Sequence, residues 1–292
     1  MLVRVMGNKI NWPANLIEEI AYRRCIIFLG SGISATSKNI NGNKPPTWGK
    51  FIDEIKKLMK DNTKADEEFI DNMIKQENYL MALQAIYDLS DPGAYNKYLK
   101  DTYARGGYLP SEVHKAIKAI DSKIVITTNF DKIYENLCNG DGYVVEDYKN
   151  SRSIISNIKS PESIIIKAHG TIDDTDKIIF TSKQYYEAQA KYPEFYSLLH
   201  SLFLTNTVIF LGYSLNDPDI NLVLQNINNT SNTTCPHYVV LKEGTSKHII
   251  RHWRDTYNIT ALEYGPSYEE LEENIVELKE LVEELRNERG IY

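Results

Sequence analysis

The sequence predicts an α/β protein with a Rossmann-like, doubly wound parallel sheet of about six strands and an inserted small helical module. Six short apolar runs alternate with stretches that are compatible with helices, which is typical of parallel strands joined by helical crossovers. About 95 residues separate the first run from the second, far more than one crossover needs, so we expect the helical module there. The runs lie near residues 25–29, 124–127, 164–168, 207–211, 237–241 and 259–262.

A single domain is expected for the 292 residues. With 42% hydrophobic residues, the chain can bury one sizeable α/β core and a smaller helical piece. Amphipathic patterns fill the stretch from Trp48 to Ile120. We therefore expect one domain over residues 1–292, with a core at 15–35 and 121–265, a helical insertion at 36–120 and a C-terminal amphipathic helix at 267–289.

The C-terminal helix is acidic and carries an apolar stripe. Ser267 and Glu270 have the spacing of a capping box. The stripe either packs back on the core or forms an oligomer or partner interface. We expect a homo-oligomer whose regulation comes from another subunit, because no sensor or repeat domain follows this helix. The stripe consists of Leu271, Ile275, Leu278, Val282 and Leu285.

Charge and hydropathy argue against two classes of partner. The 33 Lys and Arg residues against 40 Asp and Glu give a net charge of -7, which repels nucleic acid, so we expect no direct contact with it. No run reaches 18 consecutive apolar residues, and Met1–Asn8 lacks the apolar region and cleavage site of a signal peptide. We expect a cytoplasmic protein that makes no membrane contact.

A glycine turn follows the first predicted strand. The segment from Cys25 to Ala35 reads CIIFLGSGISA, so that Gly30, Gly32 and Ala35 fit a G-x-G-x-x-A spacing. Glycines at such a turn let backbone N–H groups approach a pyrophosphate, although a tight turn alone also explains them. We expect the turn to bind the phosphates of a dinucleotide through Gly30, Ser31, Gly32 and Ser34.

Polar residues also follow three later strands. Thr128, Asn129 and Asp131 follow the second run, His169 follows the third, and Gly212 and Ser214 follow the fourth. Ligands of open α/β sheets bind outside the carboxyl ends of the strands, so we expect these residues to form one pocket.

These motifs, in this order, resemble the sirtuin family. The chain has G-S-G-I-S at residues 30–34, T-T-N-F-D at 127–131, H-G at 169–170 and L-G-Y-S-L-N-D-P at 211–218. The last motif is similar to that of sirtuin-like NAD-cleaving domains in bacterial anti-phage systems, such as the Thoeris effector and the sirtuin partners of HerA-type ATPases. The resemblance implies NAD as a substrate, a helical module that closes over nicotinamide and ribose, a loop at 36–46 that folds over NAD, and a possible HerA-type ATPase/helicase partner in defence.

The cysteines depart from the deacylases of this family. Cys25, Cys138 and Cys235 stand alone, so the four-cysteine zinc ribbon that forms one wall of the acyl-lysine cleft cannot be built. The histidines have no H-E-x-x-H spacing, and we expect no metal. The absence of G-K-[ST] after the glycine turn also argues against a P-loop ATPase. We expect NAD cleavage without protein deacylation.

The chemistry of NAD cleavage needs little from the protein. Nicotinamide leaves as a neutral molecule, so an immobilised ribose, an oriented water and a base near neutral pH are sufficient. His169 is the expected base, against the alternative of a core histidine, and Asn129 is expected to hold a water and a ribose hydroxyl rather than only form a turn.

Three further residues take their roles from the resemblance. It implies that Asp131 accepts from the nicotinamide amide, although this carboxylate could instead cap the next helix. Gly212 and Ser214 would lie against the adenosine ribose and phosphates. Asp217 is expected to cap the helix that follows.

Two other functions compete with NAD cleavage. A non-catalytic subunit that senses NAD or ADP-ribose would keep the glycine turn without needing His169. A dehydrogenase is disfavoured, because no acidic residue follows a second strand about 20 residues after Gly32, and Asp53 falls in an expected helix.

Overall fold

The computed structural model describes residues 9–215, 218–230 and 235–291. Two sequence-based expectations lie outside these ranges. One is the interpretation of Met1–Asn8 as a segment that is not a signal peptide, and the other is Asp217 as a helix cap.

The predicted parallel sheet is confirmed, and it has seven strands in the order β3-β4-β2-β1-β5-β6-β7. Every neighbouring pair is parallel. Four of the strands, β1, β2, β4 and β5, are buried along their whole length, which explains their continuous apolar runs. The strands are β1 (Cys25–Leu29), β2 (Ile124–Thr127), β3 (Tyr143–Asp147), β4 (Ser163–Lys167), β5 (Thr207–Leu211), β6 (His237–Lys242) and β7 (Ile259–Tyr264).

One strand, β3, was not predicted from the sequence. It lies at the edge of the sheet and pairs only with β4 among the described strands. Its residues are half-buried or exposed, and its apolar run ends after Val145 at Glu146 and Asp147. An edge strand needs no apolar run, because one of its sides faces solvent.

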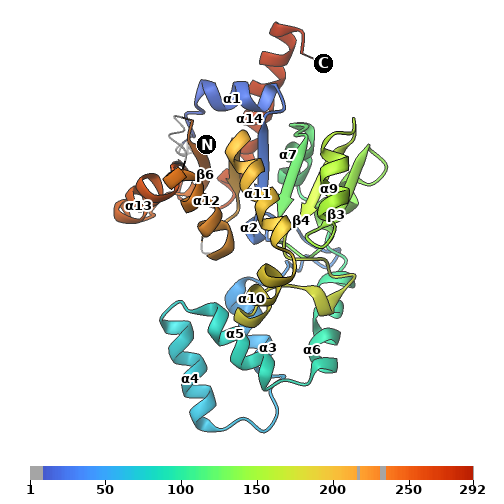
Figure 1. Cartoon of the computed structure of the whole chain (residues 1–292), viewed down its shortest axis with the longest axis vertical. Coiled ribbons are helices and arrows are strands. Elements are labelled where there is room, and N and C mark those ends of the chain that lie inside the picture. Colours follow the sequence, from blue (N-terminus) through green and yellow to red (C-terminus); the bar gives the residue numbers. More distant parts are fainter. Residues whose placement is uncertain (1–8, 216–217, 231–234, 292) are drawn as a thin grey trace, which may run out of the picture.

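Helices cover both faces of the sheet (Figure 1). Alternate strand residues point to opposite faces: Ile27 and Leu29 join one core cluster, and Ile26 and Phe28 join the other. The first cluster is completed by α1 (Ala14–Ala21), α7 (Glu112–Ala119), α8 (Ile133–Cys138) and α14 (Glu270–Arg289). The second is completed by α9 (Ser151–Ile158), α10 (Ser182–Lys191), α11 (Pro193–Thr205), α12 (Pro218–Thr230) and α13 (Lys247–Tyr257).

The helical module lies at one end of the sheet, below it in Figure 1. Its core takes in residues from outside the insertion: Ile172, Ile178 and Phe180 from the segment after β4, and Phe130 from the segment after β2. The module is therefore built around two of the loops that carry predicted site residues. Its helices are α3 (Trp48–Lys56), α4 (Lys64–Lys75), α5 (Tyr79–Asp88), α6 (Pro92–Leu99) and the π-helical turn η1 (Lys100–Ala104).

The apolar stripe of α14 packs on the chain's own core, between α1 and α7. Ile275, Leu278 and Val282 are completely buried there. The Nε of Arg286 donates to the carbonyl of Ala21 and fixes the far end of the helix. Packing back on the core, the first of the two alternatives, is confirmed. The expected homo-oligomer stays a prediction.

The start of α14 differs from the prediction. The helix begins at Glu270 rather than at 267, and its N-cap is Glu269. Ser267 does not cap it, because its Oγ donates to the Glu269 carboxylate and accepts from the Glu269 N–H within the preceding turn. The capping-box prediction is wrong: Ser267 is satisfied by a closer partner.

Across the described part of the chain, no helix combines the length and apolarity that crossing a membrane requires.

Candidate functional site

The chain changes sides of the sheet at β1. From β1 it passes through the helical module to β2 on one side, and it later returns to β5 on the other side. The carboxyl ends of β1 and β5 therefore flank a topological switch point, which is where open α/β sheets bind their ligands.

Three glycines bring the turns after β1 and β5 into backbone contact. A Cβ on Gly30 would lie 2.4 Å from the carbonyl oxygen of Gly212, and one on Gly32 would lie 2.8 Å from the Gly212 Cα. Gly212 itself has φ +61°, and its Cβ would lie 2.5 Å from the backbone nitrogen of Ile33. The free space above Gly30 and Gly32 is thus filled by protein. Their expected contact with phosphate stays a prediction, and close packing of the two turns explains their small size.

A cavity of about 530 Å³ opens at this edge of the sheet. Its wall is formed by the segments that follow the strands and by residues of the helical module. All of the predicted site residues except Gly30 and Gly32 line it. They are Ser31, Ser34, Thr128, Asn129, Asp131, His169, Gly212 and Ser214.

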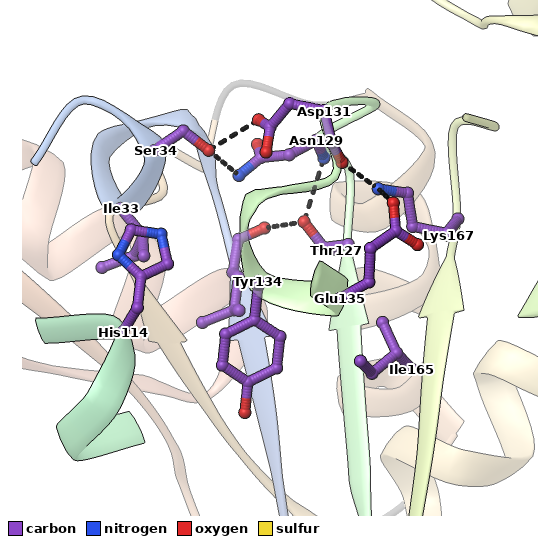
Figure 2. A pocket seen from close by; sticks show the side chains of 11 residues that line it. Ile33, Ser34, His114, Thr127, Asn129, Asp131, Tyr134, Glu135, Ile165 and Lys167 are labelled. Atoms are coloured by element: carbon purple, nitrogen blue, oxygen red, sulfur yellow. Dashed lines mark hydrogen bonds and ion pairs between the residues drawn. The ribbon is translucent and has the colours of Figure 1, made fainter. Parts of the chain in front are cut away.

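Asn129 joins the end of β2 to the glycine turn. Its Nδ2 donates to the carbonyl of Gly30 at 2.9 Å. The Nδ2 also donates to the Oγ of Ser34 at 3.0 Å, and the backbone N–H donates to the Oγ1 of Thr127 (Figure 2). Both amide donors are therefore engaged by the protein. The Oδ1 oxygen of Asn129 accepts no hydrogen bond from the described residues. It is therefore the atom of this amide that could accept a hydrogen bond from a ligand.

Asp131 is buried and bonded through both carboxylate oxygens. Oδ1 accepts the N–H of Ile133, the first residue of α8, and Oδ2 accepts the hydroxyl of Ser34 at 2.7 Å. The carboxylate therefore contacts the first residue of the helix, but the N-cap of α8 is Lys132 and not Asp131, so the capping alternative is wrong in its position. It also lines the cavity, so the expected contact with a nicotinamide amide stays a prediction.

His169 is buried at the end of β4 and faces the cavity. Tyr185 of α10 packs edge-on against its ring, with centroids 5.1 Å apart and an angle of 80° between the planes. The Nδ1 of His169 and the Tyr185 hydroxyl are 3.5 Å apart, which is long for a hydrogen bond. Tyr185 thus limits the orientation of the imidazole mainly through packing.

The helical module supplies an aromatic half of the cavity that sequence reasoning missed. Phe51, Tyr79 and Tyr103 line it from the module, and Phe130 and Phe180 line it from the loops that the module encloses. Burial raises the pKa of Tyr103 well above its ordinary value, so its phenol stays protonated. One weak signal for Tyr103 was present: this residue lies in an amphipathic stretch, where an aromatic residue usually indicates only a core position.

Beneath the site lies a second, much smaller cavity of about 10 Å³, shown in Figure 2. This is room for roughly one water molecule. Ionisable side chains surround it, including His114, Glu135 and Lys167. Burial lowers the pKa of His114 to about 4, and burial raises the pKa of Glu135 against the opposing effect of Lys167.

Among the described residues that line the large cavity there is no Lys or Arg, whereas Glu77 and Asp131 are present. A ligand with a pyrophosphate would be held there by hydroxyl and backbone groups. Within residues 9–215, 218–230 and 235–291, no three His, Cys, Asp or Glu side chains are grouped as a metal site requires. Cys25 and Cys138 are buried, Cys235 is exposed, and all three are free thiols.

Comparison with known proteins gives one family match and several distant relatives. Residues 123–262 match the SIR2-like domain. Defense-associated sirtuin 2 of Bacillus subtilis is 23% identical over 221 residues, which are 75% of this chain and 20% of that protein. The NAD(+) hydrolase ThsA of Acinetobacter baumannii (strain 532279) is 23% identical over 214 residues, 73% of this chain and 41% of that protein. ThsA of Enterococcus faecium is 25% identical over 232 residues, 77% and 45% of the two chains. The chain spans less than half the length of each of these relatives.

Proposed function

We propose that this chain, which carries a SIR2-like domain distantly homologous to a defence-associated sirtuin and to the NAD(+) hydrolases ThsA, hydrolyses NAD to nicotinamide and ADP-ribose. The observation that carries the proposal is that Asn129 and His169, from separate strand ends, line one cavity at the switch point of the sheet. Parallel topology brings the two strand ends to one edge of the sheet, and the side chains found there are an imidazole and an amide, the two groups that this reaction uses.

The chemistry of the cavity fits this reaction. The bond between nicotinamide and ribose breaks to leave a neutral nicotinamide and a sugar with oxocarbenium character. His169 acts as the base that takes a proton from the attacking water, because an imidazole accepts protons near neutral pH. Asn129 presents its Oδ1 to a ribose hydroxyl or to that water, while its two N–H bonds hold the oxygen in place.

The shape and lining of the cavity fit NAD as a substrate. Its volume of about 530 Å³ lies in the range of cofactor-sized sites. Hydroxyl groups of Ser31, Thr128 and Ser214 line the part next to the glycine turn, where the phosphates would lie. The aromatic part formed with the module offers ring faces to the nicotinamide.

The proposed cellular role rests on the relatives. We propose that the chain depletes NAD in anti-phage defence, together with a partner such as a HerA-type ATPase, and that it does not deacylate proteins. The likeness to a defence-associated sirtuin supports the first part. The three isolated cysteines, which cannot form a four-cysteine zinc ribbon, support the last.

Substitution of the two central residues tests the activity. Purified protein, alone and with a candidate partner, is incubated with NAD, and nicotinamide and ADP-ribose are quantified by chromatography. His169→Ala and Asn129→Ala should each lower kcat by about 10² to 10⁴. His248→Ala is the matched control, because this histidine is exposed on α13.

Binding measurements separate catalysis from sensing. A catalytic His169 predicts that His169→Ala still binds NAD by calorimetry while product formation falls. If the parent protein binds NAD without forming product under any of these conditions, the chain is a sensing subunit. If a folded variant keeps the parent turnover, the substituted residue has no catalytic role.

A further inference from the structure

A buried ion pair lies directly beneath the site. Lys167, the last residue of β4, and Glu135 of α8 are 2% and 8% exposed, and their Nζ and Oε1 atoms are 3.4 Å apart. Lys167 also donates through Nζ to the main-chain carbonyl of Asp131. Figure 2 shows the three residues together, with Lys167 reaching from its strand toward the loop after β2.

The contacts of Lys167 continue into the predicted catalytic residues. Its partner Asp131 accepts from Ser34, and Ser34 accepts from the Nδ2 of Asn129. On its own strand, Lys167 precedes His169 by two residues. One ammonium group thus connects the loop that carries Asn129 with the strand end that carries His169.

Stability alone does not explain this pair. Removing two charges from water costs about as much as their attraction returns, and well-packed apolar residues of similar size often serve equally well. A buried lysine whose ammonium lies at the junction of two site loops has instead a geometric consequence. A change of about 1 Å in the spacing of catalytic groups can cost about 10² in rate.

We propose that Lys167 is a positioning residue for NAD cleavage: it fixes the Asn129 loop against the strand end that bears His169, with Glu135 as its counter-charge. This inference rests on the proposed function. Lys167 touches no substrate and acts through the Asp131 carbonyl.

The test replaces the pair by apolar residues of similar size, in the variant Glu135→Leu/Lys167→Met. We expect a melting temperature close to that of the parent, a KM within about threefold, and a kcat lower by about 10². Glu135→Gln keeps an acceptor for Lys167 and should keep kcat within about threefold. If the apolar pair does not fold, Glu135→Gln/Lys167→Gln retains a polar pair without the reach of lysine, and the same loss of kcat is expected.

An exposed ion pair between the same two loops provides a control. Lys132 and Asp173 form an exposed ion pair with Nζ and Oδ2 2.6 Å apart, and Lys132→Met breaks it. Because exposed pairs contribute little, this variant should keep the parent kcat. A folded apolar-pair variant with the parent kcat would overturn the proposal, as would a Glu135→Gln variant that loses as much activity as the apolar pair.

Amide hydrogen exchange tests the positioning role of Lys167 independently of NAD cleavage. The N–H groups of Ala168 and Ile172 donate to the carbonyls of Thr127 and Phe130, both at 2.8 Å, and these bonds join the same two strand ends. Faster exchange of the two amides in the apolar-pair variant supports the positioning role even if the parent does not cleave NAD, an outcome that would refute the proposed function alone. Unchanged exchange overturns the role of Lys167.

Discussion

Phe130 lies edge-on against Tyr103, with ring centroids 4.7 Å apart and an angle of 83° between the ring planes. Phe130 stands between Asn129 and Asp131 in the sequence, and Tyr103 lies in the π-helical turn of the helical module. The loop with the predicted catalytic asparagine is therefore packed into the module core. A displacement of the module would move this loop.

Removal of the Tyr103 ring should impair turnover. Tyr103→Ala takes away the edge-on partner of Phe130, and such a pair contributes about 0.5–1.5 kcal/mol beyond burial. With the loop less fixed, we expect kcat/KM for NAD to fall about tenfold or more. Tyr103→Phe keeps the ring and should stay within about threefold. Steady-state kinetics of the two variants decide, and equal activities of Tyr103→Ala and the parent would refute this role of the module.

Contact between the two turns should make Gly212 intolerant of a side chain. Gly212→Ala places a Cβ against the Ile33 nitrogen and also strains a backbone with φ +61°. Gly140→Ala is the matched control, because Gly140 has φ +87° and nothing lies within 4 Å of the added atom. Left-handed strain alone costs about 1–2 kcal/mol, so Gly212→Ala should lose clearly more than this on urea unfolding. Equal losses for the two variants would mean that the turns can separate freely.

Acid should destabilise the protein through His237. The Nδ1 of this buried residue accepts the N–H of Val208 at 3.1 Å, and burial lowers its pKa to about 4. The unfolded chain binds a proton near pH 6.5 and the folded chain does not, so stability is complete above pH 6.5 and falls as the pH decreases toward 4. His114 behaves in the same way.

The variant His237→Asn tests this dependence, because an asparagine oxygen can replace Nδ1 without titrating. Between pH 7 and pH 5, His237 should account for about 2 kcal/mol of the loss in unfolding free energy, and the variant should lack that share. Urea denaturation at the two pH values gives the numbers. An identical loss in parent and variant would contradict the assignment.

The strand ends of the site were predictable from the sequence, whereas the contacts between them were not. The strands that precede Asn129, His169 and Gly212 are buried on both faces of the sheet. Each of them is therefore recognisable in the sequence as a short apolar run. Their convergence follows from parallel topology alone. Tyr103 and Tyr185 come from helices, where an aromatic residue signals only a core position, and the arrangement of the module decides whether it faces a cavity.

Lys167 shows a second limit of sequence reasoning. At the end of the run Ile164–Ile166, a lysine is expected to mark the point where a strand reaches solvent. Its burial depends on Glu135, which lies 32 residues earlier on another element. Two other features could not be predicted from apolar patterning. The edge strand β3 is partly exposed and has no continuous apolar run, and at the start of α14 a contact within the preceding turn replaces the expected helix cap.

The C-terminal stripe should govern stability rather than assembly. Ile275→Glu or Leu278→Glu buries a carboxylate at a completely buried position, so we expect a loss of about 3 kcal/mol or more. Asn287→Glu adds the same group at an exposed position of α14 and should be neutral. Calorimetry and light scattering separate the two effects. A change of oligomeric state with unchanged stability would show that the stripe also serves a partner.

The most direct test of NAD hydrolysis is product analysis in water enriched in ¹⁸O, with the protein assayed alone and with its candidate partner. Hydrolysis at the ribose predicts one ¹⁸O atom in each ADP-ribose, none in nicotinamide, and equal amounts of the two products by mass spectrometry. NAD recovered intact under both conditions, or ADP-ribose without the label, would contradict the proposed function.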